Sequence, residues 1–503
     1  MIGKMKKEAT GSYSHVLKYT GIFGGVQGLN IVVSLVRNKL IAVILGPNGM
    51  GLASLFNTTV NFISQATNLG ISFSAVKHVS ELFDRGDEAA IANFVRVVRA
   101  WSLLTALFGM LVCIVAGPAL SNYTFAWGDH TLHFVLLSPA VGLLAITGGE
   151  TAILKGARQL RPLAVIQVYT VLAALVISVP VYYFFGQTGI VPVIVLMALV
   201  SMLLTVRYSY RLYPLQLRGW WGVLGEGMEM VKLGVAFVVA GVMGSGAEVL
   251  IRSFLNVSSG DLDVVGLYNA GFMLTATYAG MVFSAMETDY FPRLSSVNHD
   301  AAATNLTVNR QIEVSLLIVS PMLATLIISL PVLIPILFTS KFLPMVSMAQ
   351  IAVFSMYIKA ISLPVSYIML AKGDSIGYMV LEGIYDVLLV VLIVFGYRHW
   401  GLFGTGVALS LSYLLDILMV GAYAYLRYQY RPSVPVIYYA ALQFSLGLAA
   451  YTVTLIDNPF IYWTLGLLIC LVSLLVSVYI LHQKTSLWAS LTGKLKKRFR
   501  KNG

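Results

Sequence analysis

The chain has 503 residues, of which 58% are hydrophobic and only 11% are charged. Soluble globular proteins carry about 25% charged residues, so this composition excludes a soluble protein of several domains. The net charge of +12 then indicates basic loops that face anionic lipid head groups, rather than a protein that binds nucleic acid.

Long apolar runs follow one another along the whole chain. A helix that crosses the hydrocarbon layer needs about 20 apolar residues, and about fourteen such runs are present. The sequence therefore predicts an all-α, polytopic membrane protein with about fourteen transmembrane helices. The runs begin near Leu17, Gly49, Phe94, Phe134, Pro162, Thr188, Met230, Val265, Ile312, Pro344, Ile376, Gly401, Val436 and Phe460.

Lys and Arg are distributed unevenly over the loops between these runs. If the N-terminus is cytoplasmic, most of the 33 basic residues fall in cytoplasmic segments. Basic loops are retained on the cytoplasmic side, so we expect both ends of the chain there. The basic tail at Lys494–Lys501 is typical of a segment that lies on anionic lipid, and nucleic-acid binding is the alternative interpretation of that tail.

Two halves of the chain carry the same landmarks in the same order. A shift of about 215 to 220 residues superimposes a series of short motifs from the first half on the second half. The matching pairs are Arg37 with Arg252, Gly51 with Gly266, residues 154–156 with 371–373, residues 188–189 with 405–406, and the Arg-Tyr-x-Tyr-Arg runs at 207–211 and 427–431. Five landmarks that keep their order indicate a tandem repeat of six spans.

An even number of spans in each repeat gives both repeats the same orientation in the membrane. We therefore expect two parallel-repeat six-helix lobes around a central cavity, as in secondary transporters that rock around a central site. The predicted domains are a first lobe at residues 1–228, a second lobe at 229–431, and two extra helices with the basic tail at 432–503.

Four cations lie inside the predicted spans or near their ends: Arg37, Lys39, Arg252 and Lys359. An ionised group at mid-membrane costs about 2.5–3.5 kcal/mol, so each of them needs a cavity or a partner. Arg252 follows Glu248 by one helical turn, so a structural pair explains it as well as a binding role does. Lys359 has no carboxylate within one turn, which favours an anionic ligand.

Besides Glu150 in the first lobe and Glu248 beside Arg252, three carboxylates lie in the predicted spans: Glu382, Asp386 and Asp416, all in the second lobe. Glu382 and Asp386 are one helical turn apart, so they share a face of one helix. In one interpretation they bind a proton or Na⁺ for ion coupling. In the other they form a structural pairing with Lys359.

The extramembrane segments offer little for catalysis. No Gly-x4-Gly-Lys-Ser/Thr motif is present, so the chain is not expected to hydrolyse ATP. The outer loops are short, and His130 with His133 in one of them is more typical of a solvated loop than of a metal site. We therefore predict no enzyme activity, no cofactor and no metal. A membrane-embedded glycosyltransferase or polymerase is the least favoured interpretation.

The run 36–42 followed by 45–52, and the run 289–295, resemble the matching segments of bacterial polysaccharide transporters. Within the multidrug/oligosaccharidyl-lipid/polysaccharide flippase superfamily, the chain is most similar to O-antigen translocases and to the lipid III flippase. The resemblance implies a monomeric flippase that moves undecaprenyl-diphosphate-linked oligosaccharide from the cytoplasmic to the periplasmic leaflet of the inner membrane by alternating access. Membrane lipids and other glycan-assembly proteins, such as a polymerase, are the implied partners.

The resemblance also implies that basic residues in the lobes hold the diphosphate. Lys39, Arg252 and Lys359 match basic positions of the lipid III flippase, and the internal repeat adds Arg37. A multidrug/cation antiporter of the same superfamily is the alternative function, in which the carboxylates would face the drug cation. Spans 13 and 14 exceed the twelve-span pattern of that flippase, and they are expected either to form a groove for the lipid tail or to be peripheral.

Overall fold

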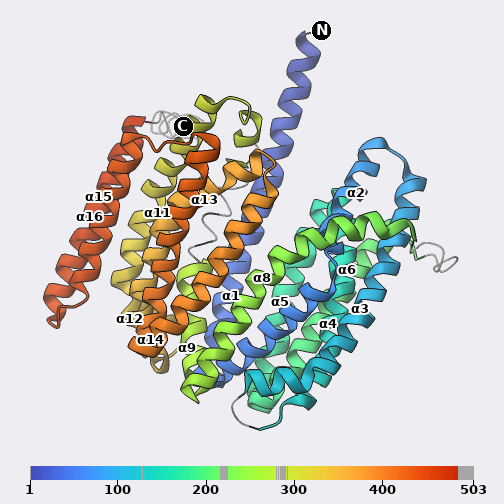
Figure 1. Cartoon of the computed structure of the whole chain (residues 1–503), viewed down its shortest axis with the longest axis horizontal. Helices are drawn as coiled ribbons and strands as arrows, with labels where there is room; N and C mark the ends of the chain where they lie inside the picture. The colour runs from blue at the N-terminus through green and yellow to red at the C-terminus, as the bar shows by residue number, and fades with distance from the viewer. Residues whose placement is uncertain are drawn as a thin grey trace, which may run out of the picture. The chain divides into compact units, whose positions relative to one another are not determined.

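The computed structural model of the chain describes residues 2–125, 128–215, 225–278, 280, 283, 290–291 and 293–484. The described residues are almost entirely helical and form no strand (Figure 1). This confirms the predicted all-α fold. The basic tail at Lys494–Lys501 lies outside the described residues.

The chain divides into two compact units: unit 1 comprises Met1–Gly266 and Ile336–Lys341, and unit 2 comprises Leu267–Pro335 and Phe342–Gly503. The elements of unit 1 are α1 (Ile2–Thr67), α2 (Ile71–Arg85), α3 (Glu88–Thr124), α4 (Thr131–Gly156), α5 (Leu160–Phe185), η1 (Gly186–Gly189), α6 (Ile190–Leu212), η2 (Gly225–Gly227), α8 (Met228–Ser259) and the first residues of α9 (Leu262–Phe272). Unit 1 thus extends beyond residue 228, because α8 is bonded to α1 and α3. The two predicted lobes stay a prediction.

Unit 2 begins within α9 and carries the remaining elements. They are η3 (Met273–Tyr278), α11 (Ala301–Leu337, whose last residues belong to unit 1), η4 (Ser340–Met345), α12 (Val346–Ala352), α13 (Phe354–Ala371), α14 (Ser375–Tyr428), α15 (Val434–Val453) and α16 (Pro459–Lys484). The element η3 has π-helical geometry.

Nine helices in the described part of the chain are long and apolar enough to cross a membrane. Three of these nine cover two predicted runs each: Gly28–Thr67, Arg161–Leu212 and Ser375–Tyr428. Each contains a glycine with positive φ where the sequence predicts the boundary: Gly46 (66°), Gly186 (56°) and Gly401 (57°). The chain is therefore a multi-pass membrane protein, while the number of about fourteen spans stays a prediction.

Helices α2, α3 and α4 pack around one apolar core in unit 1. Ile71, Val98 and Ile153, one from each helix, are completely buried there. Another part of α3 is exposed and not buried in this core: Leu107, Leu111 and Val115 follow one another at intervals of one turn on its surface. Such a stripe of large apolar side chains suits contact with lipid tails.

In unit 2, the core lies mainly between α11 and α13 and includes Ile312 and Ile368. Helix α15 pairs with α16 (Figure 1). Their buried contact is polar: Gln443 Nε2 donates to Ser477 Oγ at 2.9 Å, and Ser473 Oγ donates to Gln443 Oε1 at 2.8 Å. Hydrogen bonds between apolar helices hold the pair together where water is absent.

Candidate functional site

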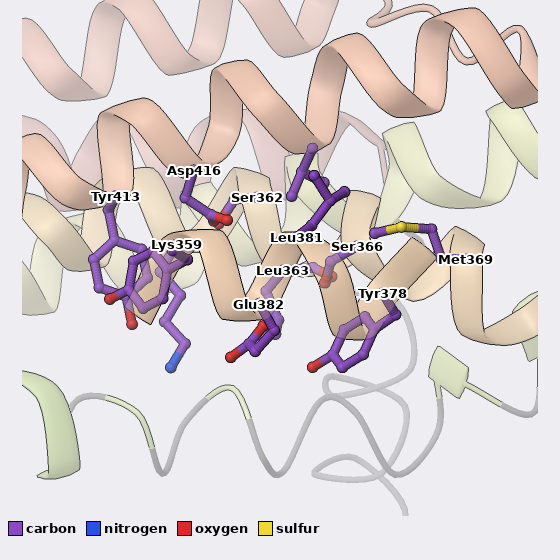
Figure 2. A pocket seen from close by; sticks show the side chains of 12 residues that line it. Lys359, Ser362, Leu363, Ser366, Met369, Tyr378, Leu381, Glu382, Tyr413 and Asp416 are labelled. Carbon is purple, nitrogen blue, oxygen red and sulfur yellow. The ribbon is translucent and has the colours of Figure 1, made fainter. Parts of the chain in front are cut away.

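A cavity of about 200 Å³ lies between α13 and the two halves of α14 in unit 2 (Figure 2). Three predicted site residues line it: Lys359 from α13, Glu382 from the first half of α14 and Asp416 from its second half. The other lining residues are Ser362, Leu363, Ser366, Met369, Tyr378, Leu381, Tyr385, Tyr413 and Val420. The cavity therefore combines one cation and two carboxylates with the hydroxyl groups of serines and tyrosines.

Helical periodicity and one sharp turn position these side chains. Lys359 and Ser362 are three residues apart, so they share one face of α13. Gly401 interrupts α14 with φ of 57°, and the second half of the helix runs back alongside the first. Glu382 and Asp416 reach the same cavity because of this reversal.

Asp374 precedes the first residue of α14 and links the start of this helix to its last turns. Its Oδ1 accepts a hydrogen bond from the backbone N–H of Gly377 at 2.9 Å, and its Oδ2 accepts from Tyr423 at 2.6 Å and Tyr428 at 2.5 Å. The hydrogen bonds from Tyr423, Tyr428 and Gly377 lower the pKa of the Asp374 carboxyl. Asp374 thus caps the first half of α14 and ties it to the second half.

Lys359 reaches into the open side of the cavity. The side chain is half-buried, and its amine lies 5.9 Å from the centre of the Tyr413 ring. Figure 2 shows this amine and the Glu382 carboxylate on the same side of the cavity, whereas the Asp416 carboxylate lies beside Ser362. Within the described residues, no carboxylate lies at ion-pair distance from Lys359.

Asp386 has different surroundings from Glu382, although the two are one turn apart on α14. Glu382 is exposed at the cavity, whereas Asp386 is 8% exposed and does not line it. The structure thus brings Glu382 and Asp416 to Lys359 and places Asp386 in the interior of unit 2. The predicted role of the three carboxylates, in ion coupling or structural pairing, stays a prediction.

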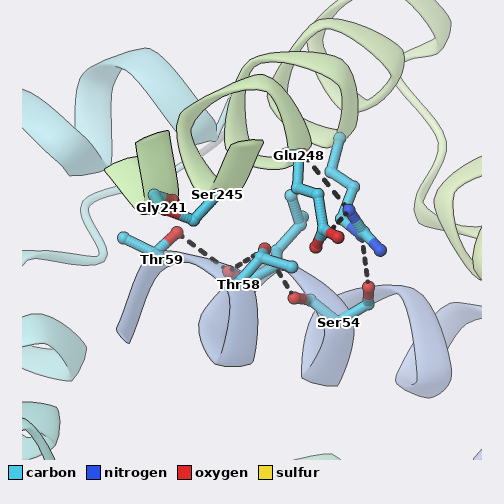
Figure 3. Close-up of polar contacts among 8 residues, drawn as sticks. Ser54, Thr58, Thr59, Gly241, Ser245 and Glu248 are labelled. Atoms are coloured by element: carbon cyan, nitrogen blue, oxygen red, sulfur yellow. Dashed lines mark hydrogen bonds and ion pairs between the residues drawn. The ribbon is translucent and has the colours of Figure 1, made fainter. Parts of the chain in front are cut away.

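Arg252 on α8 is almost completely buried, with 5% of its surface exposed. Its Nε donates to Ser54 Oγ at 2.9 Å, and its Nη1 donates to Glu248 Oε2 at 3.2 Å (Figure 3). The structural pair with Glu248 that the one-turn spacing predicts is therefore present. Binding of a diphosphate by Arg252 stays a prediction, and it would require these bonds to be exchanged for bonds to the cargo.

Lys39 and Arg37 lie close together on α1. Lys39 Nζ donates to the backbone carbonyl of Phe338, just after the end of α11, where a cation complements the helix dipole. Arg37 is half-buried and lies within electrostatic range of Tyr182 on α5. Both belong to unit 1, as does Arg252, whereas Lys359 belongs to unit 2. Joint binding of one diphosphate by the four cations stays a prediction.

An apolar groove of about 650 Å³ lies on another face of α13 and α14, also in unit 2. Helix α15 forms one wall of it. The lining residues are Leu316, Ile351, Phe354, Tyr357, Ile358, Ile361, Val407, Ser410, Leu411, Leu414, Ile417, Ala440, Ala441, Phe444, Ser445 and Leu448. Helices α13 and α14 therefore separate a polar cavity from an apolar groove.

A family model described as polysaccharide biosynthesis protein matches residues 40–347, which is more than half of the chain. The chain belongs to this family. The resemblance inferred from the runs near Arg37 and at 289–295 is thereby confirmed. Among curated proteins, none matches the chain.

Solved structures of transporters share the fold of this family member. The lipid II flippase MurJ in an inward closed conformation has a TM-score of 0.72 and 14% identity, covering 92% of this chain and 99% of MurJ. An inward-facing multidrug resistance MATE family transporter of the MOP superfamily has a TM-score of 0.67 and 12% identity, covering 80% of this chain and 94% of the transporter. A MOP superfamily transporter from Pyrococcus furiosus has a TM-score of 0.59 and 13% identity, covering 82% of this chain and 96% of the transporter. At such identities the likeness shows the fold alone.

Sequence reasoning missed one polar site in unit 1. Arg99 on α3 and Glu150 on α4, 5% and 2% exposed, form a bidentate ion pair: Nε–Oε1 is 2.8 Å and Nη2–Oε2 is 3.3 Å. The guanidinium also donates to Ser209 Oγ and the Pro214 carbonyl, and it lies 4.2 Å from the centre of the Tyr210 ring. The sequence signal for this pair is Glu150, a carboxylate inside the apolar run that begins near Phe134.

The two histidines of the predicted outer loop pack in unit 1 against aromatic rings. The His130 and His133 rings are 5.1 Å apart, and His130 lies 4.1 Å from the ring of Phe125. Among the described residues, no group of three or more His, Cys, Asp or Glu is arranged to hold a metal ion.

Proposed function

We propose that this family member is a flippase for undecaprenyl-diphosphate-linked oligosaccharide, such as an O-antigen or related repeat unit. One observation carries the proposal: α13 and α14 present a polar, half-open cavity on one face and an apolar groove on another. A cargo with a sugar diphosphate head and a polyprenyl tail needs both environments side by side.

In this proposal the head group occupies the cavity of unit 2. Lys359 neutralises the diphosphate through charge-assisted hydrogen bonds, and the hydroxyl groups of Ser362 and Tyr378 bind sugar hydroxyls. The tail lies in the groove beside α15, which gives the predicted thirteenth span a function. Arg37, Lys39 and Arg252 contribute in other steps of the transport cycle, when their present contacts are exchanged.

The membrane potential supplies a driving force for this cargo. The cytoplasm is negative, so outward movement of a negative charge is favourable by about 2.3 kcal/mol per charge per 100 mV. The two charges of a diphosphate would gain about 4.6 kcal/mol at 100 mV, provided that Lys359 does not travel with them. The cargo leaves chemically unchanged, so the function is transport and not catalysis.

The location follows from the cargo. We propose the bacterial inner membrane, with both termini in the cytoplasm, for a protein that acts as a monomer beside a polymerase and other glycan-assembly proteins. Cysteine labelling from the periplasm tests the orientation: a cysteine in place of Gln187 would react, and one in place of Lys155 would not. The reverse result would contradict it.

Reconstituted vesicles test the function. Proteoliposomes that contain undecaprenyl-diphosphate-linked glycan extracted from cells are held at a fixed potential with no pH gradient, and the glycan on each leaflet is measured. We expect flipping that increases with the potential, retention of activity in the control Lys341→Ala, and loss in Lys359→Ala. Absence of flipping by the unchanged chain would overturn the proposal, and independence from the potential would remove only the proposed driving force.

A cation antiporter is the second candidate, because Glu382 and Asp416 line the same cavity. Carboxylates without a paired cation attract positively charged drugs. Efflux of a cationic dye from the same vesicles, lost in Glu382→Gln, would favour this function over glycan flipping.

A further inference from the structure

A second polar cavity, of about 310 Å³, lies in unit 1 at its predicted outer end. Four segments that are distant in sequence converge on it: α1, the connection before α4, the turn η1 between α5 and α6, and the connection between α8 and α9. Its lining residues are Asn48, Leu52, His130, Gln187, Gly260, Asp261 and Leu262. Its size is at the lower end of the range for small-molecule sites.

The lining groups suit an uncharged, hydroxyl-rich molecule. Asn48 and Gln187 carry amides that both donate and accept, and Gln187 Nε2 already donates to Asn48 Oδ1 at 3.0 Å. Asp261 accepts, and His130 adds an imidazole. No Lys or Arg stands among these lining residues, so the diphosphate is not the part of the cargo that the cavity favours. A single carboxylate is also too few for a site that binds divalent cations.

Local hydrogen bonds hold Asp261 in place before any ligand arrives. Gly260 ends α8 with φ of 64°, a conformation that favours glycine, and directs the chain into the connection. The backbone N–H of Asp261 donates to Ser259 Oγ at 3.1 Å, and its Oδ1 accepts from the N–H of Asp263 at 2.9 Å. A preorganised acceptor loses less entropy on binding than a mobile one.

Next to the lining residues Asn48, Leu52 and Leu262, the two sequence repeats make a close backbone contact. A Cβ on Gly51 would lie 2.3 Å from the carbonyl oxygen of Leu262, and a Cβ on Gly266 would lie 1.9 Å from that of Pro47. Gly51 and Gly266 are the repeat mates identified in the sequence, and each meets the residue four positions before the other. Leu262 both lines the cavity and takes part in this contact, which leaves no room for a side chain at either glycine.

From this arrangement we propose that the outer cavity binds the sugar rings of the cargo on the side where the cargo is released. The cavity of unit 2 holds the charged head, and the cavity at Asn48 and Asp261 receives neutral sugar residues while the Gly51–Gly266 contact is closed. The identity of the ligand as a glycan rests on the proposed function.

Photocrosslinking in cells that make the surface glycan tests this site. Benzoylphenylalanine replaces Gln187 in the outer cavity, Tyr378 in the unit 2 cavity, or Phe184, which is 76% exposed and lines neither cavity. After irradiation, each purified chain is analysed by mass spectrometry for adducts of undecaprenyl-diphosphate-linked glycan. We expect sugar adducts at positions 187 and 378 and none at 184.

Every other pattern of adducts also discriminates between the outer site and the proposed function. Adducts at 378 without adducts at 187 would overturn the outer site and leave the proposed function standing. Adducts at neither position would overturn both. Adducts at 187 alone would support the outer site and count against the head-group cavity, whereas adducts at all three positions would show unspecific labelling and overturn the site.

A substitution pair then tests the chemistry of the outer site. Asp261→Ala should lower the yield of the adduct at position 187 about fivefold, the effect of one lost hydrogen bond. Asp263→Asn removes a charge two residues away that does not line the cavity, so it should leave the yield unchanged. Equal yields in the two variants at equal abundance would contradict the assignment of Asp261.

Discussion

Arg99 and Lys359 are both cations inside helical bundles, but of these two only Arg99 has a carboxylate at ion-pair distance among the described residues. Arg99 shares a bidentate pair with Glu150 and has further partners on α6. Lys359 lies in a cavity with two carboxylates, neither of which is at ion-pair distance among the described residues. A charge that is fully satisfied stabilises one arrangement of helices, whereas a charge that faces a cavity is available to a ligand.

The largest effect is expected where the satisfied pair is broken. Glu150→Ala leaves the Arg99 guanidinium buried without its counter-charge, which should lower the free energy of unfolding by about 3–5 kcal/mol. Thermal unfolding of the purified protein in detergent measures this loss. The double variant Arg99→Met with Glu150→Leu should recover most of it, because two apolar side chains need no partner. A loss below about 1 kcal/mol in Glu150→Ala would contradict a role of the pair in stability.

The next effect concerns transport and leaves stability unchanged. Lys359→Ala should lower glycan export about a hundredfold, because the charge-assisted bonds to the diphosphate are lost. Surface glycan per cell, normalised to the amount of the protein, measures this. Lys359→Arg keeps the charge and should retain part of the activity. Normal surface glycan in Lys359→Ala would show that the lysine serves only the structure.

A smaller effect is expected at the carboxylates of the same cavity. Glu382→Gln and Asp416→Asn remove negative charge near the proposed diphosphate, so glycan flipping should change by less than about tenfold. The vesicle assay measures it against the unchanged chain. Loss of flipping on the scale of Lys359→Ala would instead assign these carboxylates to an obligatory ion-coupling step.

The smallest effect is expected at Asp374, outside the cavity. Asp374→Ala removes the cap of α14 and should cost about 1 kcal/mol. The pKa of this carboxyl is lowered in the folded protein. The unchanged chain should therefore exceed Asp374→Ala in free energy of unfolding by the full amount above the ordinary carboxyl pKa of about 3.9. This difference in the free energy of unfolding is lost as the pH falls through the pKa that Asp374 has in the folded protein. Unfolding of both proteins over a pH series measures the difference, and a constant difference down to low pH would refute it.

The repeat motif at 207–211 and 427–431 shows how one sequence pattern acquires two roles. In unit 1, Tyr210 lies against the Arg99 guanidinium, and Ser209 accepts from it. In unit 2, Tyr428 donates to Asp374. The motif predicts where a helix ends, but the partner of each tyrosine depends on the chemistry of the neighbouring helix.

The separation of partners along the chain explains which parts of the site were predictable. Arg252 and Glu248 are one helical turn apart, so their pairing follows from helix geometry alone. Arg99 and Glu150 are 51 residues apart on different helices, and no local pattern connects them. The outer cavity is the extreme case, because its lining comes from four separate segments.

By itself, the sequence determined the membrane class, the all-α fold and the family, because apolar length and short motifs are local properties. It also singled out Lys359, since a cation deep in an apolar run has no local partner. Only the tertiary structure decided that Arg99 is neutralised, that Glu382 and Asp416 reach the cavity of Lys359, and that α13 and α14 separate this cavity from an apolar groove. The physical reason is that helix periodicity fixes the face of a side chain, whereas packing between helices selects its neighbours.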